Sequence, residues 1–113
     1  MLNQTDMLIK RNLRLPDRRT SVQLEAYVWH SIDAILLLES INLCLLIAEI
    51  DQRRGPMKLA SSIRLFALIY YRTLTDSMQA SRTEKNMLYS PQTEYVSCFL
   101  RALQQFSRYA QHA

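Results

Sequence analysis

The sequence has little of what tight turns require, since its 113 residues include one glycine and three prolines. This scarcity argues against a β-rich fold and favours helices separated by a few breaks. Cysteine is also scarce: Cys44 and Cys98 lie far apart, each in an apolar helical pattern and without metal-binding spacing. We expect both to be buried thiols in a reducing compartment. The sequence therefore predicts a mainly helical protein with no metal site and no cofactor.

The charge balance is modestly basic. Fourteen lysines and arginines face ten acidic residues, which gives a net charge of +4. Such an excess favours an anionic partner, but alone it does not distinguish nucleic acid from a membrane or an acidic protein. The sequence shows no pairing of a nucleophile with a base and no phosphate-binding loop, so we do not expect an enzyme.

One apolar stretch, residues 32–50, is almost long enough to cross a bilayer. Asp33, Glu39 and Glu49 interrupt it, and charged groups are costly at that depth. The stretch is better interpreted as two buried helices of a protein that does not bind a membrane. The first twelve residues lack the long apolar run of a secretory signal, so a cytoplasmic location is expected.

A single short strand pattern stands near the start. From Arg19 to Glu25 the side chains alternate. Val22 and Leu24 point to one side of the strand, and the polar residues Arg19, Ser21 and Gln23 point to the other. Residues 1–17, which turn basic towards their end, are expected to be a flexible arm. The strand then has no partner later in the chain, and its backbone would need one from elsewhere.

Helical spacing dominates the rest of the chain. We expect a first helix over residues 26–38, a second from an N-cap at Asn42 to about residue 53, and a third over residues 60–74. A polar linker over residues 75–89 leads to an amphipathic helix over residues 90–113, with Ser90 as its N-cap. We expect four divisions of the chain: a flexible basic arm (1–17), a ribbon-forming helical domain (18–74), a linker (75–89) and a final helix (90–113).

The segments RRTSVQLEAYVWHSIDAI and LASSIRLFALIYYR resemble a bacterial ribbon-helix-helix-like family, of the MetJ and Arc type of DNA-binding protein. The resemblance covers residues 18–72. Two residues depart from the family pattern: Ser40 stands where a glycine is usual at the helix corner, and Val28 replaces an aromatic residue.

The resemblance implies a fold and a site. The fold is mainly α with one N-terminal strand, a ribbon-helix-helix dimer extended by a third helix and by the C-terminal amphipathic helix. The second strand of the ribbon comes from an identical subunit. Bases are read by Arg19, Ser21 and Gln23. The DNA backbone is held by Arg11, Arg14, Arg18, Asn42, Leu43 and Cys44. The dimer core contains Val22, Leu24, Val28, Trp29, Ile32, Leu46, Ile47 and Ile50.

The function implied is that of a homodimeric transcriptional regulator that binds double-stranded DNA in a sequence-specific way. Residues 90–113 could pack within the same assembly, join dimers into higher oligomers, or receive another protein. The leucines at 36–38 are expected in the core or at the dimer interface. Two alternatives remain at this stage: an antitoxin whose C-terminal region neutralises a toxin, and a helical adaptor that never contacts DNA.

Overall fold

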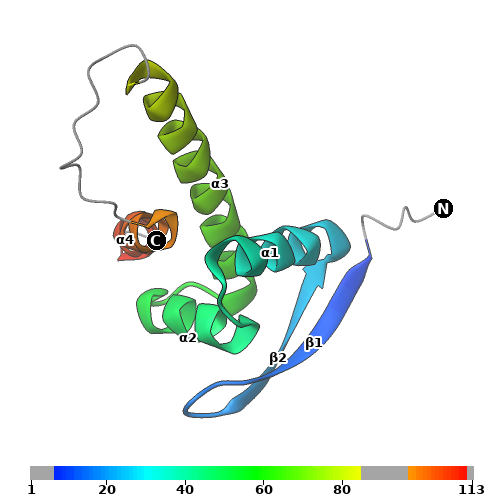
Figure 1. Ribbon diagram of the computed structural model, residues 1–113. Helices are drawn as coiled ribbons and strands as arrows, with labels where there is room; N and C mark the ends of the chain where they lie inside the picture. Colours follow the sequence, from blue (N-terminus) through cyan, green and yellow to red (C-terminus); the bar gives the residue numbers. More distant parts are fainter. Residues whose placement is uncertain (1–6, 85–96, 112–113) are drawn as a thin grey trace.

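The computed structural model describes residues 7–84 and 97–111. An N-terminal ribbon of two strands is followed by helices, as Figure 1 shows. The predicted mainly helical class with strand structure at the N-terminus is confirmed. The elements are β1 (Leu8–Arg14), β2 (Arg19–Glu25), α1 (Ala26–Glu39), α2 (Leu43–Arg53), α3 (Leu59–Glu84) and α4 (Cys98–Gln111).

The partner of β2 lies in the same chain, which corrects two expectations. β1 pairs antiparallel with β2 in a register that runs from Leu8 opposite Glu25 to Arg14 opposite Arg19. The Leu15 N–H donates to the Arg18 carbonyl oxygen at 2.8 Å and closes the turn. Residues 8–14 are therefore a strand and not a flexible arm, and the ribbon does not need a strand from a second subunit. The alternation of β1 was obscured because a charged residue lies on its inner face and Leu8 on its outer face.

The corner between the first two helices follows the sequence prediction. Ser40 adopts a left-handed conformation, with φ 56° and ψ 45°, and its N–H donates to the Leu36 carbonyl oxygen. Asn42 then caps α2, where its Oδ1 accepts a hydrogen bond from the Leu45 N–H at 2.8 Å. The predicted N-cap is confirmed, and α1 and α2 meet at a bend of 105°.

The third helix is longer than expected. It continues to Glu84, so the first ten residues of the predicted linker are helical. Residues 75–84 contain no glycine or proline and include Met78, Gln79 and Ala80, which favour helix. The remainder of the predicted linker and the cap at Ser90 lie outside the described residues.

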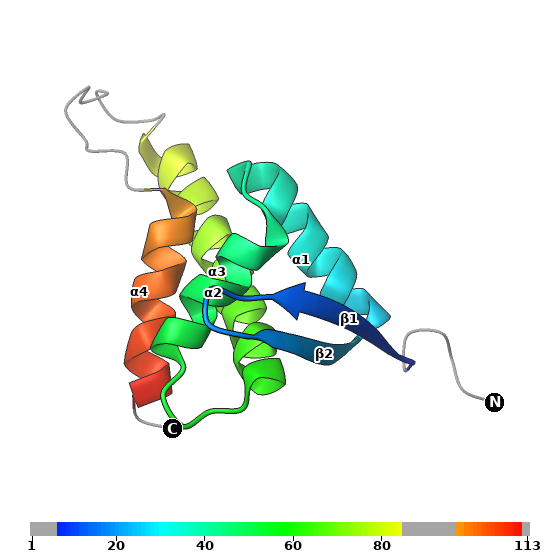
Figure 2. The same ribbon diagram turned by 90° about the horizontal axis from the view of Figure 1, so that it is seen from below.

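The last helix packs against its own chain. Its apolar face, which includes Leu103 and Phe106, lies against α2 and α3. The Phe66 ring of α3 makes edge contacts with Phe99 and Phe106, at centroid distances of 6.1 and 6.3 Å. Figure 2 shows that α4 and the ribbon lie on opposite sides of the other helices.

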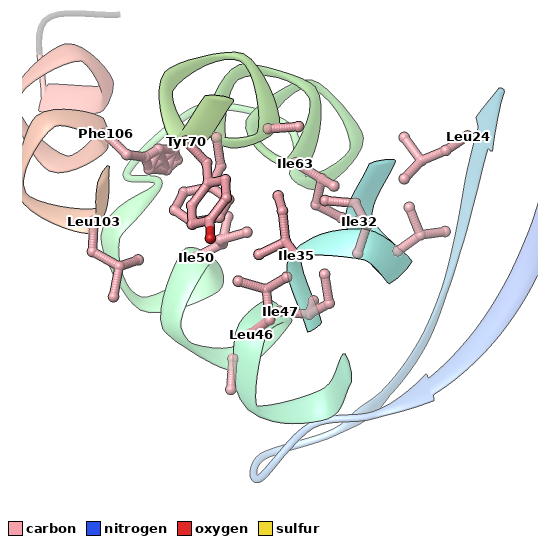
Figure 3. Packing of buried hydrophobic residues seen from close by; sticks show 14 of the residues in the cluster. Leu24, Ile32, Ile35, Leu46, Ile47, Ile50, Ile63, Tyr70, Leu103 and Phe106 are labelled. Atoms are coloured by element: carbon pink, nitrogen blue, oxygen red, sulfur yellow. The ribbon is translucent and has the colours of Figure 1, made fainter. Parts of the chain in front are cut away.

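One continuous core joins the ribbon to α4 (Figure 3). Leu24 of the ribbon points towards Ile32 and Ile63, while Tyr70 lies near Phe106 at the other end. The residues assigned to a dimer core are in this single-chain core, where all but the partly buried Val28 are buried. Cys98 is partly buried. Cys44 is exposed, contrary to expectation, because it lies beside the buried stripe of α2.

No single helix in the described ranges is long and apolar enough to cross a membrane. Together α1 and α2 meet the requirements of length and composition, but the 105° bend separates them, and seven of their apolar residues are buried inside the protein.

The left-handed corner yields a stability prediction. Ser40→Gly should raise the free energy of unfolding by up to about 1 kcal/mol, because glycine adopts this conformation without a Cβ clash. Ala34→Gly, at an exposed position in the middle of α1, should instead lower it by about 1 kcal/mol. Urea unfolding followed by circular dichroism measures both. Equal destabilisation by the two variants would contradict the structure of this corner.

Candidate nucleic-acid interface

The ribbon has two chemically different faces. Side chains directly opposite one another in an antiparallel pair lie on the same face, and the face alternates along each strand. One face packs on the helices and buries Leu13, Val22 and Leu24. The other face begins with Leu8 opposite Glu25 and continues with three pairs whose side chains are all exposed, Lys10 with Gln23, Asn12 with Ser21, and Arg14 with Arg19. We call these six residues the outer face.

The outer face contains every residue that the sequence assigned to base reading. Arg19, Ser21 and Gln23 are all exposed, as the alternation of β2 predicted. Sequence reasoning missed Lys10 and Asn12, since residues 1–17 were interpreted as an arm. The signal that could have found them is the basic, weakly alternating run LIKRNLR, which precedes a turn of four residues.

The cations of the outer face have no acidic partner among residues 7–84 and 97–111. Within the described part of the chain, Lys10, Arg14 and Arg19 form no ion pair. Arg14 is directly opposite Arg19, and like charges in this arrangement repel one another. Glu25, opposite Leu8 at the end of the same face, is a carboxylate, but it is paired with Arg64 of α3. A polyanion bound here would gain attraction and would relieve that repulsion.

Arg11 differs from its neighbours because it lies on the inner face. Its two terminal nitrogens donate to the Asp33 carboxylate at 2.9 Å each, and its guanidinium lies 4.4 Å from the centre of the Trp29 ring. The hydrogen bonds from Arg11 lower the pKa of Asp33. This arginine fastens β1 to α1 and does not point outward.

Arg18 holds the turn of the ribbon against α2. It donates two hydrogen bonds of 2.9 Å to the Asp51 carboxylate, which also accepts one of 2.7 Å from Arg54. These bonds, led by that from Arg18, lower the pKa of Asp51 to about 2. The turn is therefore tied to α2 by Arg18, and Arg54 at the end of α2 shares the same carboxylate.

The other end of the ribbon is held by α1 and α3. The Trp29 indole N–H donates to the Ile9 carbonyl oxygen at 2.7 Å. Glu25, at the end of β2, accepts a hydrogen bond of 2.8 Å from Arg64, which lowers the pKa of Glu25. With both ends attached, the ribbon presents its outer face in a defined orientation.

The start of α2 lies beside the turn of the ribbon. A shallow hollow between them is lined by Arg14, Asn42 and Cys44, among others. The Asn42 side chain is engaged as the cap, and the N–H groups of Leu43 and Cys44 precede the first hydrogen bond of the helix. These N–H groups, the positive end of the helix dipole and Arg14 make the hollow suited to an anion.

No group of histidine, cysteine, aspartate or glutamate side chains in residues 7–84 and 97–111 could hold a metal ion.

The tie between the turn and α2 should depend on pH. Because the pKa of Asp51 is lowered in the folded protein from 3.8 to about 2, its contribution to stability is present above about pH 4 and is lost as the pH falls towards 2. Asp51→Asn should lower the melting temperature by about 2 to 5 °C at neutral pH, and the difference from the wild type should shrink below pH 4. Asp76→Asn, at an exposed site, is the control. A difference unchanged by acid would contradict the ion pair.

Residues 8–71, more than half of the chain, match the family model of the ribbon-helix-helix domain. The match begins with β1 and ends in α3, so it includes both strands of the ribbon. No curated protein and no solved structure matches the chain. Ribbon-helix-helix domains are in general DNA-binding domains of regulators or antitoxins. The resemblance seen in the sequence is confirmed: the chain belongs to the ribbon-helix-helix family.

Proposed function

We propose that this protein is a sequence-specific DNA-binding transcriptional regulator whose β1–β2 ribbon enters the major groove. That groove is about 12 Å wide and admits a two-stranded ribbon, and each base pair presents a distinct set of donors and acceptors there. The observation that carries the proposal is the composition of the outer face. Three cations without acidic partners in the described part of the chain lie beside two amide groups and one hydroxyl group, and all six side chains are exposed.

The proposed base contacts on β2 follow from side-chain chemistry. Gln23 suits the N6 and N7 atoms of adenine, Arg19 suits the O6 and N7 atoms of guanine, and Ser21 can contact either. Alternate residues of a strand are about 6.7 Å apart, which corresponds to about two base-pair steps. The three side chains would therefore follow about four steps along the groove.

The proposed contacts to the DNA backbone flank the ribbon. Arg14, Asn42 and Cys44 line one hollow at the start of α2, where a phosphate of the groove edge would lie near the N–H groups of the first turn. Arg11 and Arg18 are not proposed as contacts to the DNA backbone, because their guanidinium groups are bound to Asp33 and Asp51. Only part of the backbone set predicted from the sequence is therefore retained.

We also propose a homodimer, since ribbon-helix-helix proteins generally bind DNA as dimers. The described sheet contains two strands, so one edge of β2 pairs with no described strand. Joining two such edges would make a sheet of four strands about 14 Å across, wider than the groove of about 12 Å. A contact outside the ribbon fits better. Leu37 and Leu38 at the end of α1 are 83% and 60% exposed and are available for it.

An antitoxin remains a second candidate for one reason. Leu68 and Tyr109 are 68% and 60% exposed, and both line a hollow between α3 and α4 where a protein could bind. The apolar face of α4 itself is buried on its own chain, so a toxin would have to use this outer surface. An adaptor that never contacts DNA would use the same surface and would leave the outer face of the ribbon without a role.

Two substitutions on the outer face should have different effects. Gln23→Ala should cost roughly 1 to 3 kcal/mol of binding free energy on the preferred sequence and should remove the preference at one base pair, because a base contact is lost. Arg14→Ala should weaken binding to all sequences alike and reduce the salt dependence, because a phosphate contact is lost. Fluorescence anisotropy titrations with preferred and random duplexes, between about 50 and about 200 mM salt, measure both effects.

Arg108→Ala is the matched control for charge, since Arg108 is exposed on α4, across the molecule from the ribbon. It should change DNA affinity much less than Arg14→Ala. Equal losses for these two variants would mean that DNA responds to net charge alone. No binding of the wild type even at low salt would exclude the regulator and favour the adaptor.

A further inference from the structure

We propose that β1 also reads bases, through Asn12 and Lys10, so that the ribbon of one chain recognises an asymmetric stretch of DNA. This inference rests on the proposed function and adds a second row of reading residues to it. The residues that the sequence assigned to reading all lie on β2, and the pairing with β1 puts a second row beside them.

The geometry follows from the register of the ribbon. Asn12 is directly opposite Ser21, and Lys10 is directly opposite Gln23. The Cβ atoms of such a pair are about 5 Å apart, which is less than two base-pair steps of about 3.4 Å. Any base pair within reach of Ser21 is therefore within reach of Asn12 or adjacent to one that is. A ribbon that enters the groove deeply enough for β2 to read bases brings β1 to the same depth.

The chemistry of the β1 row suits base edges. The Asn12 amide can donate to N7 and accept from N6–H of adenine, and the Lys10 ammonium can donate to O6 and N7 of guanine. Both side chains are exposed. Neither has a hydrogen-bond or ion-pair partner in the part of the chain that the structure describes, so neither is engaged in holding the fold.

The two rows differ in chemistry, and this predicts an asymmetric recognition sequence. A ribbon of two identical strands has a two-fold axis through its centre, and the bases that it reads should be symmetric about that point. In the ribbon of a single chain, Asn12 faces Ser21 and Lys10 faces Gln23. The stretch read by one ribbon should therefore have no internal two-fold symmetry. A dimer would repeat that asymmetric stretch as two separate half-sites.

Selection of bound fragments from random DNA tests the inference with four proteins: the wild type, Asn12→Ala, Ser21→Ala and Gln104→Ala. Gln104 is exposed on α4, away from the ribbon, and its loss removes an amide without touching the outer face. Asn12→Ala should reduce the preference at one base pair about tenfold and leave the other positions unchanged. Ser21→Ala should act at the same or the neighbouring base pair, and Gln104→Ala should select the wild-type motif. Circular dichroism checks that all four fold.

Each result bears on the inference in a distinct way. If Asn12→Ala selects the wild-type motif unchanged while Ser21→Ala does not, β1 only supports β2: the inference fails and the proposed function stands. A wild-type motif with a two-fold centre inside one read stretch would also overturn the inference. If the wild type selects no motif at all, sequence-specific binding fails, and the inference fails with it.

Discussion

The pairing of β1 with β2 inside one chain is the interaction on which the rest of the structure depends. It satisfies one edge of the β2 backbone, and its register decides which side chains share a face. Because the strands pair with Asn12 opposite Ser21, three polar and three cationic side chains gather on one exposed surface while Leu13, Val22 and Leu24 are buried beneath it. A shift of one residue in either strand would turn that strand's apolar residues to the outside.

The pairing of individual arginines indicates where an anion could bind, and the net charge of the protein does not. Arg11, Arg18 and Arg64 each engage a carboxylate on another element, and each ties the ribbon to a helix. The cations of the outer face have no such partner among the described residues. The same residue type thus has two roles, which are decided by the face of the strand on which it lies. A net charge of +4 cannot distinguish the two.

Local signals in the sequence were enough to predict much of the fold. The bounds of β2, the cap at Asn42, the corner at Ser40 and the outward side chains of β2 all follow from alternation, capping and helical spacing. β1 gives a weaker signal, because its alternation is interrupted by Arg11 on the inner face, which is neutralised by Asp33 of α1 and covers the Trp29 ring. That arrangement exists only after folding. Because β1 was not predicted from the sequence, the ribbon was expected to take its second strand from another subunit.

The central claim is that each ribbon is made by one chain, and nuclear magnetic resonance tests it most directly. In a mixture of isotopically labelled and unlabelled protein, filtered experiments separate contacts within one chain from contacts between two. Protons of Arg11 and Val22, which are directly opposite in the register, should show cross-strand contacts only within a chain, at every dilution. Strong contacts between Val22 of a labelled chain and the β2 strand of an unlabelled one, with none between β1 and β2, would contradict the account.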